Sequence, residues 1–275
     1  MSSDRPRITI CIPHWQVKAL MTLCLRAIRK HSHQYNLEVI VVDNGSCDDS
    51  LDYLRLLKWI RLVERPGEVH TNWPQNTLSA WDRGLQDATG EYFITMHSDV
   101  FVRRDDWLDP FLQEMNHDPS VAGVGTWKLN LETPLYAFQK KILGHATATI
   151  KSLFGRKKTI APKEGHYPRD YCAMYRRNVI LKHNFTFHSV HGGGGYGIAK
   201  QLWDAGYSTR MVPVHELAAK IVHVAHGTAA VVPEKPLRHK RTQRKAERKV
   251  AKLFSENWIE ALRDDASLDL GRPAP

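Results

Sequence analysis

The first 42 residues constrain the fold more than any other part of the chain. Two short runs rich in β-branched and aliphatic residues, Ile8–Ile12 and Leu37–Val42, have the composition of buried strands. The segment between them carries apolar residues at helical spacing, namely Val17, Leu20, Met21, Cys24 and Ile28. A strand, a helix and a strand in this order form a parallel pair joined by a crossover helix. The sequence therefore predicts a β-α-β unit.

The alternation continues along the chain. The spacing predicts a helix over Leu78–Ala88 that ends before Gly90, a strand over Tyr92–Met96, a helix over Leu108–Met115 and a strand over Val121–Thr126. We therefore expect an α/β fold with a Rossmann-like, mostly parallel mixed sheet and helices on both faces. Ligands of such sheets bind at the carboxyl ends of the strands.

The periodicity fades from Lys128 to about Gly165, which indicates an insertion or a mobile loop. The glycine run Gly192–Gly195 lacks the surroundings of a nucleotide-binding fingerprint and is interpreted as a flexible lid or acceptor loop. Regular structure is expected to return with Tyr171–Ile180, and the pattern predicts a helix over Ile198–Ala205 and strands over Thr209–Val214 and Ile221–Val224.

The positive charge is concentrated near the C-terminus. Of the net charge of +10, residues 235–252 supply +8, from nine Lys or Arg against Glu247. We divide the chain into a catalytic domain, 1–232, and a basic amphipathic helix with a frayed tail, 233–275. Its apolar side is predicted to carry Ala246, Val250, Leu253, Phe254, Asn257 and Trp258. The basic side could bind nucleic acid or an anionic membrane surface, or it could be a solvated helix face.

The cysteines and the hydropathy suggest a location. Cys11, Cys24, Cys47 and Cys172 form no CxxC pair, and no apolar stretch approaches the roughly 18–20 residues of a spanning helix. We expect a reduced, cytoplasmic protein, with any membrane contact peripheral and on the inner face.

Polar residues follow the first two predicted strands. The first strand ends in Pro13 and the second in Asp43-Asn44-Gly45-Ser46, at the edge where a doubly wound sheet binds ligands. A carboxylate there could accept hydrogen bonds from a nucleobase or a ribose hydroxyl. The same four residues are also favourable turn chemistry, so Asp43 could be a turn residue alone.

The segments ITICIPHW, LEVIVVDNGSCDDSLDYL and LSAWDRGLQDATGEYFITMHSDVFVRRDDWL resemble the family-2 glycosyltransferases, and looser similarity extends over residues 8–228. The resemblance implies a GT-A fold and an inverting hexosyl or pentosyl transfer from a UDP-, dTDP- or GDP-sugar. It also implies a donor site that includes Pro13, Asp43, Asn44, Asp82, His97 and Asp99.

Asp99 is the first predicted metal ligand. A strand of buried character delivers His97-Ser98-Asp99 to the carboxyl edge, where Mn²⁺ or Mg²⁺ could bridge Asp99 and the donor diphosphate. Asp99 could instead be a helix N-cap or a surface turn acid. The resemblance matches Asp99 to the last acid of an Asp-x-Asp motif. His97 replaces the usual first acid and could lie against the donor sugar or the ribose.

Histidines of the HVAHGT segment are further candidates. The resemblance implies that a histidine after the last core strand completes the metal shell, and His226, before Gly227-Thr228, matches that position. His223 alternates with valines on a predicted strand and is interpreted as a packed or hydrogen-bonded histidine.

The general base is not identified by the sequence. The resemblance implies an acidic pair before the helix that ends in Ala-Gly-Tyr, but this chain has Gly194-Gly195 there. His191 and His188 lie just upstream, and an imidazole has a suitable pKa. Both could be ordinary loop histidines, and Asp170, Asp204 and Glu216 remain alternatives.

The sequence thus predicts a metal-dependent glycosyltransferase whose acceptor is a glycan, a lipid-linked sugar or a nucleic acid. The competing hypothesis is a nucleic-acid-binding protein built on an inactive transferase-like domain, because of the basic helix, His97 and the missing acidic pair.

Overall fold

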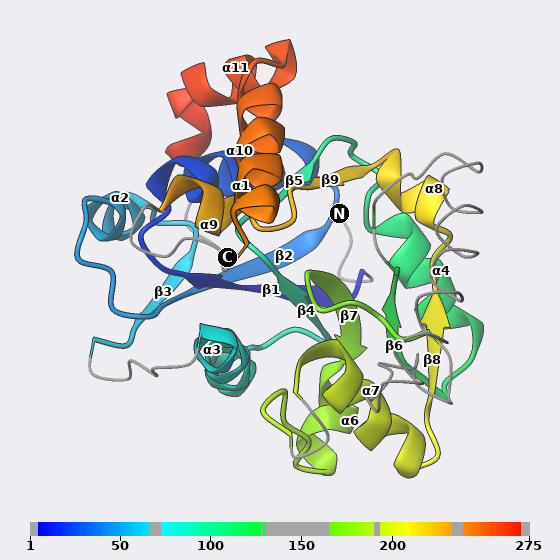
Figure 1. Cartoon of the computed structure of the whole chain (residues 1–275). Coiled ribbons are helices and arrows are strands. Elements are labelled where there is room, and N and C mark those ends of the chain that lie inside the picture. The colour runs from blue at the N-terminus through cyan, green and yellow to red at the C-terminus, as the bar shows by residue number, and fades with distance from the viewer. Residues whose placement is uncertain are drawn as a thin grey trace, which may run out of the picture.

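The computed structural model describes residues 5–66, 73–127, 129, 166–189, 193–232 and 239–270. Seven strands of this part form one twisted sheet in the order β3-β2-β1-β4-β7-β6-β8 (Figure 1). They are β1 (Arg7–His14), β2 (Asn36–Asp43), β3 (Arg61–Glu64), β4 (Tyr92–Met96), β6 (Val121–Gly125), β7 (Cys172–Arg176) and β8 (Ser208–Met211).

Strand pairing confirms the predicted mixed sheet. Strands β3, β2, β1 and β4 are mutually parallel, and β6 is parallel to β8. Strand β7 is antiparallel to both of its neighbours, β4 and β6. The register pairs His14 with Asp43, so β1 and β2 end together at the carboxyl edge of the sheet.

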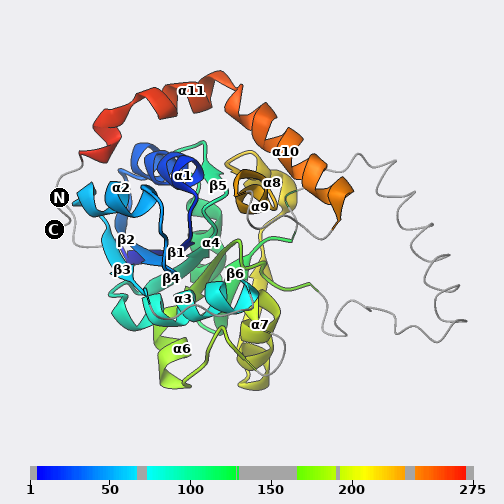
Figure 2. The ribbon, with the colours of Figure 1, turned by 60° about the vertical axis from the view of Figure 1, so that its left-hand side comes forward.

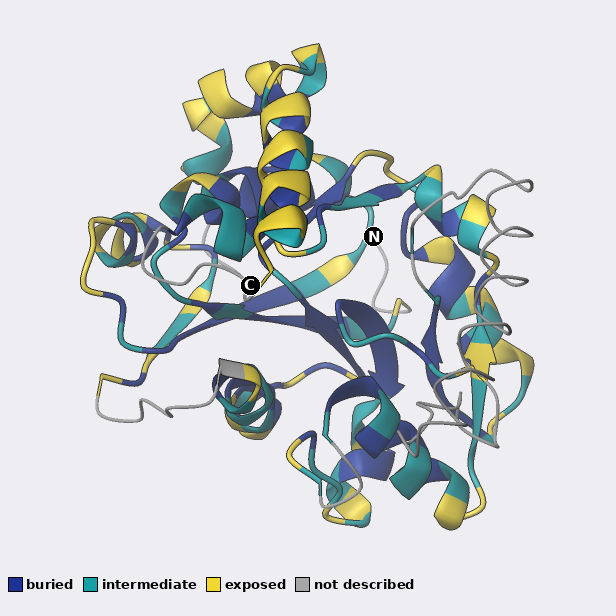
Figure 3. Ribbon diagram, viewed as in Figure 1, coloured by how far each residue is buried: buried dark blue, intermediate teal, exposed yellow. Residues whose placement is uncertain are grey.

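Helices cover both faces of the sheet, as predicted. One face packs α1 (Lys18–His31) and α4 (Asp109–His117), and the other packs α3 (Trp73–Asp87), α6 (Arg177–Lys182) and α7 (Gly194–Asp204). The short α2 (Ser50–Leu56) follows β2. Each face has its own apolar core, and the central strands between the two cores are buried (Figure 3). This burial explains why β4, YFITM, is apolar almost without interruption.

A second, two-stranded sheet was not predicted. Strand β5 (Val100–Val102) pairs antiparallel with β9 (Ile221–His223), and Val100 lies opposite His223. Two short helices flank β9, α8 (Val214–Ala218) and α9 (Gly227–Val231). The pairing brings the end of β9, the last strand in the described residues, beside the segment that follows β4.

The C-terminal segment differs from the prediction in two respects. The expected single helix is α10 (Lys240–Phe254) followed by a separate α11 (Asn257–Asp264), so Asn257 and Trp258 belong to the second helix. The expected frayed tail contains η1 (Ala266–Asp269), a 3₁₀ helix. Together these elements arch over α1 (Figure 2).

A buried arginine explains why the tail is ordered. Arg26 of α1 donates from Nε to Asp269 Oδ1 at 2.9 Å and from Nη2 to Oδ2 at 2.6 Å. It also donates to the carbonyl oxygens of Leu262 and Arg263 at the end of α11. Bidentate pairing of this kind is among the stronger charge-assisted contacts. The C-terminal segment is therefore part of the packed fold as far as Asp269, in spite of its polar sequence.

Strand β8 ends at Met211, short of the predicted Val214, because Pro213 begins the turn into α8. The expected insertion at Lys128–Gly165 lies outside the described residues except for Leu129. No helix in the described ranges combines the length and apolar character needed to cross a bilayer.

Candidate active site

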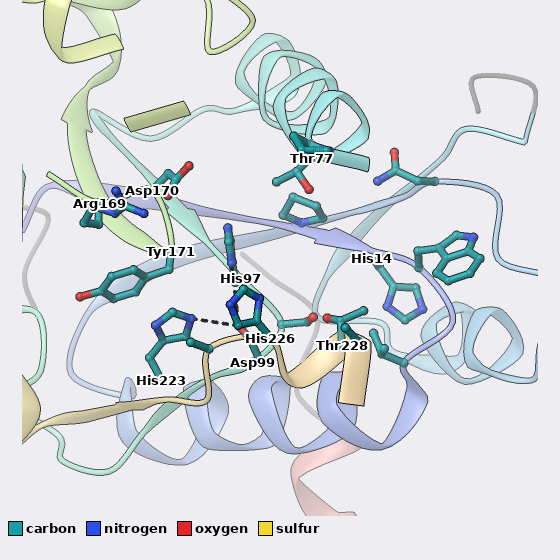
Figure 4. Close-up of a pocket in the computed structure, with 18 of the residues that line it drawn as sticks. His14, Thr77, His97, Asp99, Arg169, Asp170, Tyr171, His223, His226 and Thr228 are labelled. Carbon is teal, nitrogen blue, oxygen red and sulfur yellow. Dashed lines mark ion pairs between the residues drawn. The ribbon is translucent and has the colours of Figure 1, made fainter. Parts of the chain in front are cut away.

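A cavity of about 570 Å³ lies at the carboxyl edge of the sheet (Figure 4). Pro13 and His14 line it from the end of β1, and Asn44 from the residue after β2. His97 and Asp99 enter from the segment after β4. The opposite side is formed by Asp170 before β7 and by His223 at the end of β9. The cavity is at the place where ligands of α/β sheets bind.

His97, Asp99 and His223 form the one group of possible metal ligands found among the described residues. One ligand atom from each lies within 4.8 Å of the others. Asp99 Oδ1 is 3.4 Å from His223 Nε2 and 3.9 Å from His97 Nδ1, and the three side chains turn toward one another in Figure 4. Two imidazoles and one carboxylate are a ligand set that suits transition metals with open positions.

The Asp99 carboxylate is buried and held from one side. Its Oδ2 accepts a 2.9 Å hydrogen bond from the backbone N–H of Gly227, while Oδ1 is buried without a hydrogen bond. Burial raises the pKa of Asp99, but His223, His97 and the Gly227 N–H act in the opposite direction and bring the pKa below its ordinary value. An ionised carboxylate with one unsatisfied oxygen is what a cation ligand requires. The alternative of a surface turn acid does not fit this burial.

His97 is positioned by an aromatic neighbour. Its ring stacks on buried Trp81 of α3, with centroids 5.5 Å apart and planes 19° from parallel. Burial lowers the pKa of His97, and this effect outweighs the opposing charges of Asp99 and Asp170. The lowered pKa favours the neutral imidazole, which is the form that binds metal.

The two histidines of the HVAHGT segment occupy different positions at the cavity. His223 stacks on Tyr171, with centroids 4.2 Å apart, so it is packed as expected. It nevertheless points Nε2 at Asp99 and completes the ligand group, which the sequence did not predict. His226 is exposed at the cavity with φ of 68°, and it is not in that group. Metal binding by His226 stays a prediction.

Asp43, the last residue of β2, and Asn44 after it are predicted to bind the nucleoside and have different places: Asp43 stabilises a turn, and Asn44 lines the cavity. Asp43 is buried, and its oxygens accept hydrogen bonds from the Gly45 and Ser46 N–H groups and from the Ser46 hydroxyl. These bonds form the turn, and Asp43 is not among the residues that line the cavity. The neighbouring Asn44 does line it, and Arg65 Nη1 donates to Asn44 Oδ1 at 3.0 Å. A direct contact of Asp43 with the donor stays a prediction.

His14 is a lining residue that the sequence did not bring forward. Its Nε2 lies 2.8 Å from the Ser50 hydroxyl oxygen. Burial lowers its pKa to about 4, against the opposing effect of Asp43 and Asp48, so the ring is neutral near pH 7. The sequence signal that could have identified His14 is its position directly after Pro13, at the end of a predicted strand.

Asp82 lies away from the cavity lining. Its carboxylate accepts hydrogen bonds from the Thr186 hydroxyl and from the N–H groups of Phe187 and His188, at 2.5, 2.7 and 3.2 Å. Asp82 therefore fastens α3 to the loop before α7. The contacts observed support this structural role, and the predicted donor contact is unsupported by any of them.

Among the candidates for the general base, Asp170 alone lines the cavity in the described part of the chain. His188 is exposed and absent from the lining, and His191 lies outside the described residues. Asp204 pairs with Lys200 at the far end of α7, and Glu216 lies on α8.

The glycine run is a packing element where it is described. Gly194 and Gly195 begin α7, and Gly193 and Gly194 have φ of 65° and 60°. A Cβ on Gly195 would lie 2.4 Å from the Pro168 carbonyl oxygen. The glycines thus let α7 approach the Pro168–Asp170 segment closely, which corrects the interpretation of these residues as a flexible lid.

Comparison with known proteins agrees with the resemblance to family-2 glycosyltransferases. The sequence family described as glycosyl transferase family 2 matches residues 9–183. A PGL/p-HBAD biosynthesis glycosyltransferase of Mycobacterium bovis is 27% identical over 177 residues, which are 59% of this chain and 65% of that protein. A dolichyl N-acetyl-alpha-D-glucosaminyl phosphate 3-beta-D-2,3-diacetamido-2,3-dideoxy-beta-D-glucuronosyltransferase of Methanococcus voltae is 25% identical over 122 residues, 43% of this chain and 38% of that protein. The chain thus spans less than two thirds of either relative.

Solved structures share the architecture at lower identity. The mannosyltransferase PcManGT of Pyrobaculum calidifontis, in complex with GDP-Man and Mn²⁺, superposes with a TM-score of 0.55 and 17% identity, over 99% of this chain and 78% of that one. GalNAc-T7 with UDP, GalNAc and Mn²⁺ gives a TM-score of 0.53 and 14% identity, over 81% of this chain and 44% of that one. Both likenesses concern the fold, which is GT-A as expected.

Proposed function

The chain belongs to glycosyl transferase family 2 and is a glycosyltransferase, and from this premise we propose that its cavity transfers a sugar from a nucleoside-diphosphate sugar to an acceptor hydroxyl. The observation that carries the proposal is the His97, Asp99 and His223 group at the carboxyl edge of the sheet. The relatives and structural neighbours are sugar transferases, so a nucleic-acid-binding function is not favoured.

The three side chains fit a divalent cation. Asp99 Oδ1 is buried and accepts no hydrogen bond, and His97 Nε2 is likewise buried without a partner. A bound Mn²⁺ or Mg²⁺ would offset the negative charge that develops on the leaving diphosphate. Imidazole ligands favour Mn²⁺ between these two. Two structural neighbours were solved with Mn²⁺, and we propose that this chain also requires a divalent cation.

The nucleoside half of the donor would bind at the ends of β1 and β2. Pro13, His14 and Asn44 line that end of the cavity. Asp43 holds the turn that presents Asn44, so we expect Asp43 to support nucleotide binding through this turn. We propose a single displacement at the anomeric carbon with inversion, which the membership of glycosyl transferase family 2 implies.

The donor and metal can be tested together by thermal shift. GDP-mannose, UDP-GlcNAc, UDP-GalNAc and dTDP-glucose would each be added with Mn²⁺, with Mg²⁺ or with EDTA. A ligand at 100 times its dissociation constant stabilises by about 2.7 kcal/mol, so the correct donor raises Tm by several degrees. We expect one nucleotide class to stabilise the chain in Mn²⁺ and not in EDTA. Stabilisation by none of the four donors would contradict the proposal.

The acceptor is proposed to be a glycan or a lipid-linked sugar, with α10 in peripheral contact with an anionic membrane. Arg241, Arg244, Lys245 and Arg248 of α10 are exposed and line a basic groove. Within the described residues no ion pair neutralises them. Gln243 of the same helix donates to the carbonyl oxygen of Ala229, which lines the cavity. A lipid-linked acceptor would thus meet the site close to the membrane surface.

Vesicle co-sedimentation tests this contact. Each basic residue near an anionic surface contributes roughly 1 kcal/mol, so changing Arg241, Lys245 and Arg248 to Gln should release the protein from phosphatidylserine vesicles. The matched control changes the exposed Lys30, Lys58 and Lys182 to Gln. Equal loss in both variants would show a nonspecific effect of net charge. A mobility shift with duplex DNA measures the nucleic-acid alternative, for which we expect weak binding that salt abolishes.

A further inference from the structure

We propose that Asp170 is the general base that deprotonates the acceptor hydroxyl, an inference that rests on the proposed transferase function. The sequence lacks a carboxylate at Gly194-Gly195, where the family resemblance implies an acidic pair. The structure supplies a carboxylate to the same region from another part of the chain.

Asp170 is the one uncommitted carboxylate of the cavity within the described residues. Asp99 and Asp170 are the acidic side chains that line it. Asp99 accepts the Gly227 N–H and faces two imidazoles. The Asp170 carboxylate takes part in no hydrogen bond or ion pair with any described residue, and it lies half-buried at the cavity wall (Figure 4). It is therefore available to accept a proton from a substrate.

The position of this carboxylate explains the glycine at 194. A Cβ on Gly194 would lie 2.5 Å from Asp170 Oδ2, closer than nonbonded atoms approach, and the φ of 60° also disfavours other residues. The Asp170 carboxylate thus occupies the space beside the start of α7 into which a side chain of residue 194 would project. A side chain at position 194 would therefore require the Asp170 carboxylate to move from this place.

The segment that carries Asp170 is held on both sides. The Arg169 N–H donates to the Thr126 carbonyl oxygen at 3.1 Å. On the other side, Gly195 brings the start of α7 against Pro168, whose carbonyl oxygen would be 2.4 Å from a Cβ at 195. A base that is fixed by backbone contacts needs little reorganisation when the acceptor binds.

The proposed step balances as a single displacement. The acceptor oxygen forms a bond to the anomeric carbon while the bond from that carbon to the diphosphate oxygen breaks. The electron pair of the broken bond leaves with the nucleoside diphosphate, and the hydroxyl proton moves to the Asp170 carboxylate. This use of Asp170 leaves Asp99, His97 and His223 free for the leaving group.

The test compares Asp170→Asn with Asp204→Asn, a carboxylate variant on the outer end of α7. Nucleoside diphosphate release from the donor that stabilises the wild type is measured with water and with a panel of octyl glycosides as acceptors. We expect Asp170→Asn to lower kcat on the order of 10²- to 10³-fold, as for loss of a general base. Calorimetry with the free nucleoside diphosphate and Mn²⁺ should give a Kd within about twofold of the wild-type value, because the proposed role of Asp170 is toward the acceptor hydroxyl and not toward the nucleotide. Asp204→Asn should match the wild type in both measurements.

The possible outcomes separate the two proposals. Suppose that the wild type releases nucleoside diphosphate and that the kcat of Asp170→Asn lies within threefold of the wild-type value. This result would overturn the base assignment and leave the transferase function intact. If Asp170→Asn weakens nucleotide binding by the same factor as it lowers kcat, the base assignment is also overturned, because Asp170 would then be a donor-positioning residue. If Asp170→Asn melts well below the wild type, Asp170→Glu serves instead, and a kcat reduced with unchanged nucleotide Kd supports the proposal. A wild type that releases no diphosphate from any donor would overturn both.

Discussion

The two sides of the cavity are built in different ways. The side near β1 and β2 consists of residues that directly follow neighbouring strands, and its turn is stabilised by contacts within Asp43–Ser46. The side near Asp99 joins residues far apart in the chain, as in the hydrogen bond from Gly227 to Asp99 across 128 positions. The first side depends on local sequence, and the second depends on how β9, α9 and the C-terminal helices pack.

This difference predicts where substitutions act. We call the side near β1 and β2 the local side, and a change there should alter nucleotide affinity with little effect on the rest of the site. We call the side near Asp99 the assembled side. A change there should disturb metal binding, and some such changes should also lower the stability of the fold. Four substitutions test the assembled side of this comparison, and the expected effect decreases from the first to the last.

Asp99→Asn should have the largest effect, because it removes the anionic member of the ligand group while the amide keeps nearly the same shape. We expect kcat to fall on the order of 10³-fold, equivalent to about 4 kcal/mol of transition-state stabilisation. Calorimetric titration with Mn²⁺ in the presence of nucleoside diphosphate should show at least tenfold weaker binding. Asp204→Asn is the control. Near wild-type turnover for Asp99→Asn would remove Asp99 from the metal site.

Much of the local side and of the sheet could be predicted from the sequence. Tyr92–Met96 matches β4 at both ends, because a buried central strand is a continuous apolar run bounded by polar residues. Asn44 was placed at the cavity edge because it directly follows a strand.

The assembled side could not be predicted in the same way. His223 was identified as a packed residue, which is correct, but its approach to Asp99 follows from the pairing of β5 with β9. Strand β5 has three residues, too few for alternation to be recognised. Asp269 looked like part of a polar tail, and the contact that orders it is with Arg26, 243 positions away.

Arg26→Ala tests the part of the fold that supports the assembled side. The substitution removes both Arg26 donors from Asp269, which keeps the hydrogen bond from the Tyr53 hydroxyl, and it leaves the carbonyl oxygens at the end of α11 without the Arg26 donor. Breaking a largely buried pair should lower the free energy of unfolding by about 3 kcal/mol. Urea denaturation of the variant gives this value, with the exposed neighbour Lys30→Ala as the control. A loss below about 1 kcal/mol would mean that the C-terminal helices are held by their apolar side alone.

Gly227→Ala probes the close approach of α9 to Asp99. A Cβ at this position would lie 2.8 Å from Asp99 Cβ, so the carboxylate or the helix must move. Overpacking of this kind costs about 2 kcal/mol, and we expect it to appear as weaker Mn²⁺ binding as well as a lower Tm. Gly206→Ala is a control for the loss of a glycine in open space, because a Cβ at position 206 meets no atom within 4 Å. The φ of 84° at this position adds backbone strain to the control. Unchanged Mn²⁺ affinity in Gly227→Ala would separate α9 from the metal site.

His97→Asp should have the smallest effect, and it concerns metal preference. The substitution restores an acid where His97 stands and replaces one of two imidazole ligands by a hard oxygen ligand, which Mg²⁺ prefers. The ratio of the Mg²⁺ to the Mn²⁺ dissociation constant, measured by calorimetry with nucleoside diphosphate present, should fall by about tenfold, or 1.4 kcal/mol. Loss of the stacking on Trp81 should cost about 1 kcal/mol of stability without changing that ratio. His188→Asp, an exposed residue outside the cavity lining, is the matched control. The same ratio in His97→Asp and wild type would mean that His97 contacts the donor and does not bind the metal.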